Sequence, residues 1–271
     1  MLRDKTLAVF GTGMMGGALT RGLVHADAMP AAHIRLYDTQ SERAQAAATE
    51  LGAGAQAVAT PVDALTGADI VLLAVKPPIV ADVLKTIAPY LTPAHLVISI
   101  AAGVRLTSME ALIPAGVAVI RAMPNTPCLV GQGAAALCRG ANATDAHLAD
   151  AQALFASVGQ SVEVAEPLMD AVTGLSGSGP AYVYLIIEAM IDGAVRQGLP
   201  RDKARLLAVQ TVLGAAQMLA QSDAHPAQLR DNVTTPGGTT IAGLAALERG
   251  GVRAALSDAI AAATQRSKEL S

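Results

Sequence analysis

A glycine pair flanked by threonines, near the end of the 271-residue chain, is the stretch best suited to hold a small anionic ligand. The segment Arg230–Leu244 reads RDNVTTPGGTTIAGL, and Gly237 and Gly238 allow the positive φ angles that a tight turn requires. Apolar residues then recur at helical spacing, so Thr239 and Thr240 are expected to cap a helix start. Unpaired N–H groups at such a start, with the positive end of the helix dipole, favour an anion. An ordinary turn and helix cap is the alternative interpretation.

A second glycine-rich loop, near the N-terminus, has the spacing of a dinucleotide site. The apolar run Thr6–Phe10 leads into GTGMMG, a helical pattern follows, and Ile34–Tyr37 reads as a second strand. In this arrangement the first glycine allows the tight turn, the second lets pyrophosphate approach the backbone, and the third lets helix and strand pack closely. The loop residues expected to contact the cofactor are Gly11, Thr12, Gly13, Met14, Met15 and Gly16.

Asp38 follows the second predicted strand and bears on which dinucleotide is used. A carboxylate at this position accepts hydrogen bonds from both ribose hydroxyls of NAD and repels the 2′-phosphate of NADP. Arg43 lies about one helical turn further on and is able to offset that repulsion. We therefore expect Asp38 to contact the cofactor, with a preference for NADH. A helix cap before Ser41 is the alternative role for this carboxylate.

Three further apolar runs, at 68–75, 95–100 and 117–122, read as strands buried on both faces of a parallel sheet. Ligands gather beyond the carboxyl ends of the strands in such sheets, so the residues that follow each run should lie on one rim. The rim residues expected to contact the cofactor are Val75, Lys76, Pro77, Ala101, Met123 and Asn125. A solvated surface charge is the alternative interpretation of Lys76.

The pattern changes near residue 165, after which the chain reads as helix throughout. Strands at 134–138 and 162–164 and a helix at 145–157 complete the first part. A small-residue loop, LSGSGP at 175–180, contains Ser176, a candidate for the substrate or nicotinamide pocket or merely part of a helix-entry turn. Helices are then expected from Pro180 to about Gln197, and over 201–220 and 252–270. The first is apolar nearly all round and should be buried on more than one side. We therefore predict two domains, 1–165 and 166–271.

Composition narrows the function classes and indicates an oligomer. Hydrophobic residues make up 52% of the chain and charged residues only 15%, so we expect another subunit to cover some apolar surface. A net charge of −3 without a basic cluster argues against nucleic acid as a partner. No apolar run reaches membrane-spanning length, and the N-terminal run is too short for a signal peptide. The two cysteines and five histidines show no zinc spacing, so we expect a cytoplasmic protein with reduced thiols and no metal.

Together these motifs resemble the pyrroline-5-carboxylate reductase family over the whole chain. The matching segments are GTGMMG at 11–16, AVKP at 74–77, MPNTP at 123–127, LSGSGPAY at 175–182 and DNVTTPGGTT at 231–240. The resemblance implies an α/β fold, in which an N-terminal Rossmann-type doubly wound parallel sheet is followed by an all-α C-terminal dimerisation domain. It also implies a homodimer with the active site at its interface, which can assemble further into an oligomer such as a decamer.

The resemblance further implies reduction of the C=N bond of 1-pyrroline-5-carboxylate by NADH or NADPH, giving L-proline in the final step of proline synthesis. Thr240 then corresponds to the catalytic hydroxyl that contacts the pyrroline nitrogen. Thr235, Gly237, Gly238 and Thr239 correspond to the carboxylate cradle, and Thr235 keeps the hydroxyl of the serine that is usual there. Members of the family usually use NADPH, whereas Asp38 favours NADH.

An imine arrives protonated, so this reaction needs positioning and electrostatics more than a general acid. That requirement agrees with a C-terminal half rich in hydroxyls and glycines. Two other functions stay open. A hydroxyacid dehydrogenase would need a lysine as acid or base, and Lys203 is the only lysine between the domain change and Lys268. A regulatory protein that holds a dinucleotide without reducing a substrate is the second alternative.

Overall fold

The computed structural model describes residues 2–52 and 54–270, and these form two compact units. The first unit holds the residues up to Ser178 together with the chain from Ala262 on, and the second holds Gly179–Ala261. This division lies beyond the domain boundary predicted at 165, where the sequence pattern changes to helix, because segment 166–178 still packs on the sheet of the first unit. Met169, for example, is fully buried in one of the two cores of that sheet.

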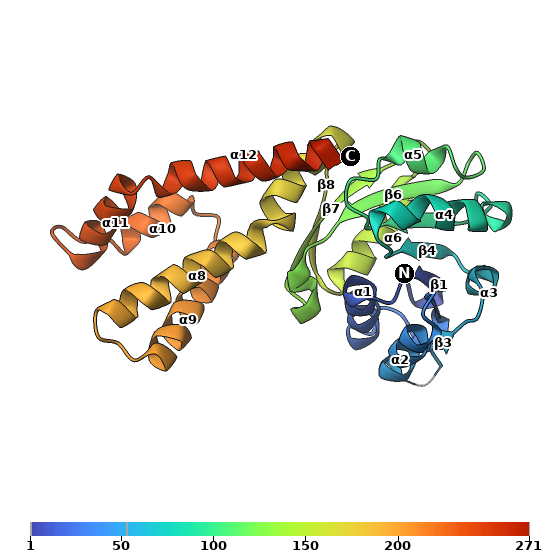
Figure 1. The fold of residues 1–271 in the computed structure, drawn as a ribbon, viewed down its shortest axis with the longest axis horizontal. Coiled ribbons are helices and arrows are strands. Elements are labelled where there is room, and N and C mark those ends of the chain that lie inside the picture. The colour runs from blue at the N-terminus through green and yellow to red at the C-terminus, as the bar shows by residue number, and fades with distance from the viewer. Residues whose placement is uncertain (1, 53, 271) are drawn as a thin grey trace. The chain divides into compact units, whose positions relative to one another are not determined.

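An eight-stranded sheet forms the centre of the first unit. Its strands are β1 (Leu7–Phe10), β2 (Ile34–Tyr37), β3 (Gln56–Ala57), β4 (Ile70–Leu73), β5 (Leu96–Ser99), β6 (Ala118–Met123), β7 (Gly133–Arg139) and β8 (Gly159–Glu163). The spatial order is β3-β2-β1-β4-β5-β6-β7-β8, with β1 to β6 parallel (Figure 1). β7 pairs antiparallel with β6, and β8 pairs parallel with β7. The prediction of a parallel doubly wound sheet is therefore confirmed for its main part, with two reversed strands at one edge.

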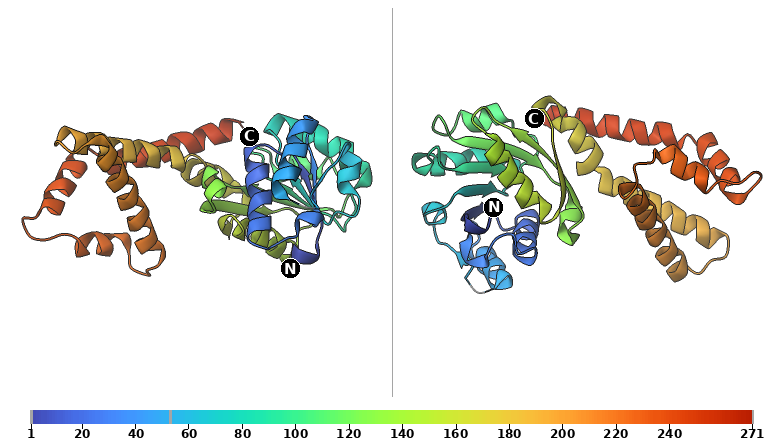
Figure 2. Two further views of the ribbon diagram at one scale, coloured as in Figure 1. Left: turned by 90° about the horizontal axis from the view of Figure 1, so that it is seen from below. Right: turned by 180° about the vertical axis from the view of Figure 1, so that it is seen from behind.

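Helices cover both faces of this sheet, which explains why its central strands β1 and β4 are apolar throughout. These helices are α1 (Met14–His25), α2 (Ser41–Leu51), α3 (Pro61–Leu65), α4 (Pro77–Ile87), α5 (Leu106–Glu110), α6 (Asp145–Ala156) and α7 (Met169–Val172). Helices α1, α2 and α6 contribute to the core on one face. Helices α3, α4, α5 and α7 contribute to the core on the other, as Figures 1 and 2 allow the reader to follow. Burial on both faces is typical of parallel sheets.

The strand order reverses between β1 and β4, the two strands that run side by side at the centre of the sheet. The loops that leave the carboxyl ends of these strands turn to opposite faces, α1 on one and α4 on the other. A crevice forms at such a point, and ligands of open α/β sheets bind in it. The topology alone therefore places the loop after Phe10 and the loop after Leu73 at the expected ligand position.

The second unit is helical. It contains α8 (Gly179–Arg196), α9 (Arg201–Ala220), α10 (Pro226–Asn232), α11 (Thr239–Arg249) and the first half of α12 (Val252–Leu270), whose end belongs to the first unit. Helices α8 and α9 pack side by side (Figures 1 and 2). Their bounds agree closely with those predicted, because Pro180 and Pro200 mark where each helix begins.

The prediction that α8 is buried on more than one side is wrong for the single chain. None of its described residues is buried, and Tyr184 and Leu185 are 63% and 66% exposed. Large apolar side chains are also exposed along α9, among them Leu206 and Leu207. The apolar character of α8 was identified correctly, and the exposed side chains agree with the expectation that another subunit covers some apolar surface. No helix in the described part of the chain is long and apolar enough to cross a membrane.

Candidate functional site

The three glycines of the first loop have three different environments. Gly11 has a φ of 95°, and a Cβ there would lie 2.6 Å from the carbonyl oxygen of Ala74, so only glycine fits. A Cβ on Gly16 would overlap the carbonyl oxygen of Gly11 and lie 3.1 Å from the Cβ of Ala74. Around Gly13, by contrast, nothing lies within 4 Å of the position of a Cβ. The geometry supports a tight turn at Gly11, close helix–strand packing at Gly16 and open space for a ligand at Gly13.

The start of α1 provides donors for an anion beside this open space. Gly13 is the N-cap of the helix, so no side chain caps its first turn, and no acidic residue stands in that turn. The first N–H groups of a helix have no intrahelical acceptor, and the helix dipole places partial positive charge there. These features fit the pyrophosphate of a dinucleotide, which would be held by backbone N–H groups in the segment 13–16.

The Asp38 carboxylate points at the glycine loop. Its Oδ2 accepts hydrogen bonds from the backbone N–H of Thr12 at 2.9 Å and from the Thr12 hydroxyl at 3.2 Å, and its Oδ1 accepts one from the backbone N–H of Gln40 at 3.0 Å. The N-cap of α2 is Gln40, without a side-chain cap, so Asp38 does not take the alternative role of N-cap residue. Arg43 is exposed in the first turn of α2.

The residues predicted on the rim follow three neighbouring strands, as expected, but differ in exposure. Lys76 is the N-cap of α4 and is exposed, and Pro77 begins that helix. Val75 and Met123 are partly buried, while Ala101 is almost fully buried, so it can contribute only its backbone or its methyl group at the rim. The topology thus brings Val75, Lys76, Pro77, Ala101 and Met123 to the carboxyl ends of adjacent strands.

Asn125 joins this rim to the predicted small-residue loop. Its side-chain amide is 9% exposed, donates through Nδ2 to the carbonyl oxygen of Ser176 at 3.0 Å, and accepts through Oδ1 from the backbone N–H of Ala134 at 2.9 Å. The amide that the sequence assigned to the cofactor therefore has a protein partner at each end. In the structure its first effect is to fix the position of the Ser176 backbone.

The segment around Ser176 is not a loop, and that prediction is wrong. Thr173–Gly177 form a π-helical turn that continues α7 toward α8. The Ser176 hydroxyl donates to the carbonyl oxygen of Val172 at 3.1 Å, and the backbone N–H of Ser178 donates to Thr173 at 2.9 Å. Such π-helical turns occur frequently at functional sites. A run of small residues is compatible with a loop and with a π-helical turn, so the sequence alone did not distinguish between them.

The threonine–glycine stretch lies in the second unit, between α10 and α11. Gly237 has a φ of 68°, and Gly238 is the N-cap of α11. The prediction that Thr239 or Thr240 caps this helix is wrong, because both residues lie inside its first turn. Since glycine has no side chain and no acidic residue stands in that turn, the first amides of α11 have no capping partner from those positions.

Thr235 closes this turn from the other side. Its carbonyl oxygen accepts a hydrogen bond from the backbone N–H of Gly238 at 3.0 Å, and a Cβ on Gly238 would overlap the Thr235 hydroxyl. Glycine at 238 therefore leaves room for the Thr235 hydroxyl in its present position. Thr235, Gly237 and Thr239 are exposed, and Thr240 is partly buried. One short turn thus combines three hydroxyls with the amides of a helix start.

Sequence reasoning missed one buried ion pair. Arg121 lies in β6 with its side chain 6% exposed, and its Nη1 is 3.1 Å from Oε1 of Glu166. The same oxygen accepts the backbone N–H of Leu106 at 2.7 Å, so Glu166 also caps the first turn of α5. An arginine inside an otherwise apolar strand is the signal that predicts such a partner, because a buried charge is costly unless it is paired.

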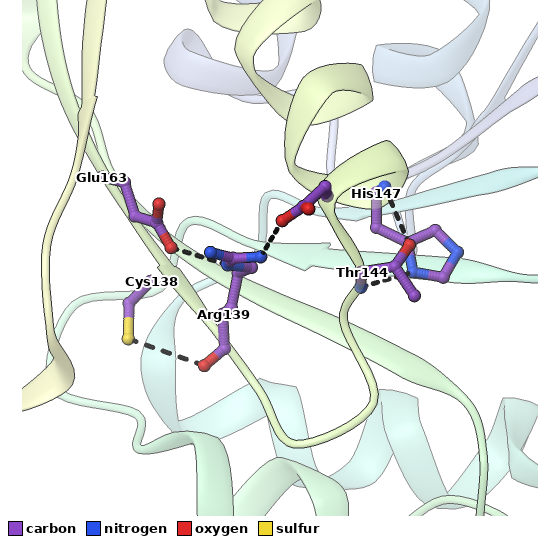
Figure 3. A network of polar contacts seen from close by, with 6 residues as sticks. Cys138, Arg139, Thr144, His147 and Glu163 are labelled. Carbon is purple, nitrogen blue, oxygen red and sulfur yellow. Dashed lines mark hydrogen bonds and ion pairs between the residues drawn. The ribbon is translucent and has the colours of Figure 1, made fainter.

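A second charged network holds the far edge of the sheet (Figure 3). The Arg139 guanidinium lies 2.6 Å from Glu163 of β8 and 2.5 Å from Asp145 at the start of α6. Hydrogen bonds from the guanidinium to these two carboxylates raise the pKa of Arg139. Thr144 and His147 form a capping box at the same helix start. The network links β7, β8 and α6, because the Arg139 guanidinium pairs with one carboxylate from each of the other two elements.

The two cysteines are buried and free. Burial raises the pKa of Cys138 to about 11, with the charge of Glu166 adding to the effect, and burial also raises the pKa of Cys128. Thiols with raised pKa values are poor nucleophiles at neutral pH. Lys203, the lysine that a hydroxyacid dehydrogenase would need, is exposed in the first turn of α9. Within residues 2–52 and 54–270, no three acidic, cysteine or histidine side chains are grouped as metal ligands.

A glycine loop at the point where the strand order reverses, followed by a carboxylate at the end of β2, defines a Rossmann-type NAD(P)-binding domain. Together with the helical unit, this domain gives the chain the organisation of NAD(P)-dependent oxidoreductases that consist of a nucleotide-binding domain and a helical domain. Two family models match separate parts of it. Residues 6–103 match the one described as "NADP oxidoreductase coenzyme F420-dependent", and residues 166–270 match "Pyrroline-5-carboxylate reductase dimerisation".

Full-length relatives agree with these matches. A pyrroline-5-carboxylate reductase of Glycine max is 44% identical over 266 residues, which cover 98% of this chain and 96% of that protein. The structure of a pyrroline-5-carboxylate reductase from Coxiella burnetii superposes with a TM-score of 0.94 at 34% identity and covers 98% of each chain. The Plasmodium falciparum pyrroline carboxylate reductase with NADP bound gives a TM-score of 0.86 at 33% identity, over 100% of this chain and 99% of that one.

The chain belongs to the pyrroline-5-carboxylate reductase family. It is an NAD(P)H-dependent oxidoreductase with an N-terminal NAD(P)-binding domain and a C-terminal dimerisation domain. The predictions of family, fold class and enzyme class are thereby confirmed, and neither a hydroxyacid dehydrogenase nor a non-catalytic binding protein is retained.

Proposed function

We propose that the turn before α11 holds 1-pyrroline-5-carboxylate while its C=N bond is reduced to give L-proline. The observation that carries the proposal is the turn itself, in which the uncapped amides of α11 lie beside the hydroxyls of Thr235, Thr239 and Thr240. The substrate has a carboxylate one carbon away from its ring nitrogen. Amides and the Thr235 hydroxyl are donors suited to the carboxylate, and the Thr240 hydroxyl oxygen is an acceptor suited to a protonated ring nitrogen.

When bound, NAD(P)H supplies the hydride that the carbon of the C=N bond accepts. The nitrogen already carries its proton and keeps it, so the protein has no proton to deliver. The role of Thr240 is to accept the N–H hydrogen bond and orient the ring, and the role of Thr235, Gly237, Gly238 and Thr239 is to fix the carboxylate. Positioning of this kind contributes by holding the reacting carbon in a productive geometry.

The cofactor is held by the first loop and the rim. The open space at Gly13 and the uncapped start of α1 fit the pyrophosphate, with Gly11, Thr12, Met14, Met15 and Gly16 forming the rest of the loop. The rim residues Val75, Lys76, Pro77, Ala101 and Met123 would border the nicotinamide end. A carboxylate at Asp38, held by hydrogen bonds, supports a preference for NADH over NADPH. The Plasmodium falciparum relative is described with NADP bound, and the assay below compares NADH and NADPH directly.

The working unit in this proposal is a homodimer whose interface includes the active site. Support comes from the exposed apolar side chains along α8 and α9, such as Tyr184, Leu185 and Leu206, in a part of the chain that matches a dimerisation model. Apolar surface of this extent is typical of a protein–protein interface. A higher oligomer such as a decamer would be built from these dimers.

The direct test is oxidation of NADH and of NADPH by the purified chain with 1-pyrroline-5-carboxylate, against a panel of 2-keto and 3-hydroxy acids. Oxidation that depends on the cyclic imine supports the proposal, and activity only on carbonyl or hydroxyl substrates refutes it. Thr240→Ala should lower kcat by roughly 10- to 100-fold and leave the KM for the cofactor nearly unchanged, since it removes one oriented hydrogen bond at the reacting group. Thr240→Ser, which keeps the hydroxyl, is the matched control. An unchanged kcat in the alanine variant would remove Thr240 from the mechanism.

A further inference from the structure

Thr12 supplies two of the three hydrogen bonds that the Asp38 carboxylate accepts. Its backbone N–H and its hydroxyl both donate to Oδ2, at 2.9 and 3.2 Å, and the remaining bond runs from the backbone N–H of Gln40 to Oδ1. The backbone bond would exist with any residue at position 12. The hydroxyl bond depends on the side chain, so it is a property of this sequence.

This arrangement leaves the carboxylate with unequal oxygens. An ionised carboxyl group has about four acceptor positions. Three are used within the protein, two of them on Oδ2, and the remaining one is on Oδ1. As arranged, Asp38 can accept one ribose hydroxyl rather than the two expected from the sequence. Because Oδ2 is tied to Thr12 by two bonds, the carboxylate is also restricted in rotation and stays close to the loop that fits the pyrophosphate.

We propose that Thr12 is a positioning residue for cofactor choice, because its hydroxyl fixes the Asp38 carboxylate in the orientation that accepts one ribose hydroxyl and opposes a 2′-phosphate. The inference rests on the proposed preference for NADH. A 2′-phosphate has no proton to donate under most conditions of assay, and it meets a negative group that cannot turn away. Loss of the Thr12 hydroxyl leaves only the two backbone hydrogen bonds on the carboxylate, which therefore turns more easily; this weakens the binding of NADH and relieves the repulsion of NADPH.

A merely structural role for Thr12 predicts a different result. Thr12 belongs to the loop that borders the pyrophosphate site, and the pyrophosphate is common to both cofactors. A distorted loop would therefore raise the KM for NADH and NADPH by the same factor and leave their ratio unchanged. Only an effect that passes through Asp38, at the ribose end, changes the ratio.

The experiment measures the Kd of NADH and of NADPH by titration of nicotinamide fluorescence without substrate, and kcat/KM for each at saturating 1-pyrroline-5-carboxylate, in the native chain, Thr12→Val and Thr12→Ser. Valine keeps the branched shape without the hydroxyl, and serine keeps the hydroxyl. In Thr12→Val the NADH/NADPH ratio should fall about fivefold, the usual effect of one net hydrogen bond, through KM rather than kcat. In Thr12→Ser the ratio should stay within about twofold of the native value. Thr12→Ala carries the same prediction as valine if the valine variant does not fold.

A double-mutant cycle with Asp38→Ala separates this inference from the proposed cofactor preference. In the Asp38→Ala background, Thr12→Val should leave the ratio unchanged, because no carboxylate remains to be positioned. If Asp38→Ala shifts the ratio but Thr12→Val does not, the inference about Thr12 is overturned while the preference stands. The same holds if Thr12→Val shifts the ratio equally in both backgrounds. If Asp38→Ala leaves the ratio unchanged, the NADH preference fails and the role of Thr12 fails with it, whereas reduction of the imine is unaffected.

Discussion

Alanine substitutions at Gly13 and Gly16 should separate the stability of the protein from its affinity for the cofactor. Both glycines belong to the same loop, and both replacements add one methyl group. The surroundings differ, since a Cβ on Gly16 overlaps the Gly11 carbonyl oxygen and a Cβ on Gly13 meets nothing within 4 Å. The methyl group of Gly16→Ala therefore presses against the backbone of the protein. The methyl group of Gly13→Ala enters the open space assigned to a ligand.

The magnitudes follow from these contacts. At Gly16 the contacted groups are backbone and the Cβ of Ala74, which cannot rotate away, so overpacking should cost about 3 kcal/mol, the upper end of its usual range. Alanine gains about 1 kcal/mol over glycine inside a helix, which leaves a net destabilisation of roughly 2 kcal/mol. For a chain of this size that corresponds to a fall in Tm of about 4–8 °C. At Gly13, φ is −68° and ψ is −168°, which alanine adopts freely, so stability should change by no more than about 0.5 kcal/mol.

Thermal unfolding at one protein concentration and titration of NADH fluorescence measure the two quantities. Gly13→Ala should melt like the native chain and bind NADH at least about tenfold more weakly, because its methyl group stands where the pyrophosphate approaches the backbone. Gly16→Ala should melt early. Equal losses of stability in both variants, or native affinity in Gly13→Ala, would refute the separate roles assigned to these glycines.

Three further results are expected. Glu166→Gln should lower the free energy of unfolding by about 3 kcal/mol in urea titrations, because it leaves the buried Arg121 guanidinium without a counter-charge. Arg121→Met should lower the free energy of unfolding by less, because it removes the buried charge itself. An equal loss of stability in the two variants would contradict this reasoning. Because folding raises the pKa of the Cys138 thiol from 9.0 to about 11, the folded state holds its proton more tightly, so its contribution to stability is complete below pH 9 and is lost as pH rises toward 11. Cys138→Ala should flatten that decline, and an unchanged pH profile would count against it. Leu185→Glu, on the exposed face of α8, should reduce the mass measured by light scattering to that of a monomer, whereas an unchanged mass would place the interface elsewhere.

Much of the fold could be predicted from the sequence, because local signals and global topology agree there. Helix α9 begins after Pro200, and the strands β4 and β5 are short apolar runs of the kind that parallel sheets bury. The reversal of β7 and β8 could not be predicted, since the apolar pattern of a strand carries no information on its direction. The two-residue strand β3 is too short to leave a pattern at all.

The candidate site was predicted in its residues more than in its contacts. Glycine spacing identified the loop at 11–16, because Gly11 and Gly16 meet backbone requirements that no other residue meets and Gly13 leaves open space for a ligand. The assignment of side-chain partners depended on distances across the fold, which spacing does not contain. Asn125 was assigned to the cofactor but holds Ser176 and Ala134, and the helix cap assigned to Thr239 or Thr240 belongs to Gly238.

The return of α12 to the first unit has a practical consequence for dissecting the protein. The chain leaves the nucleotide-binding unit at Ser178 and re-enters it at Ala262, so the helical unit is an insertion rather than an appended tail. In the part of α12 that belongs to the first unit, the Ser267 hydroxyl donates a hydrogen bond to the Asp170 carboxylate at 2.6 Å, which connects the last helix to the segment that precedes the insertion. A stand-alone cofactor domain should therefore be made by removing residues 179–261 and joining the two ends. A plain truncation after 165 or 178 would remove the end of α12, which belongs to the first unit.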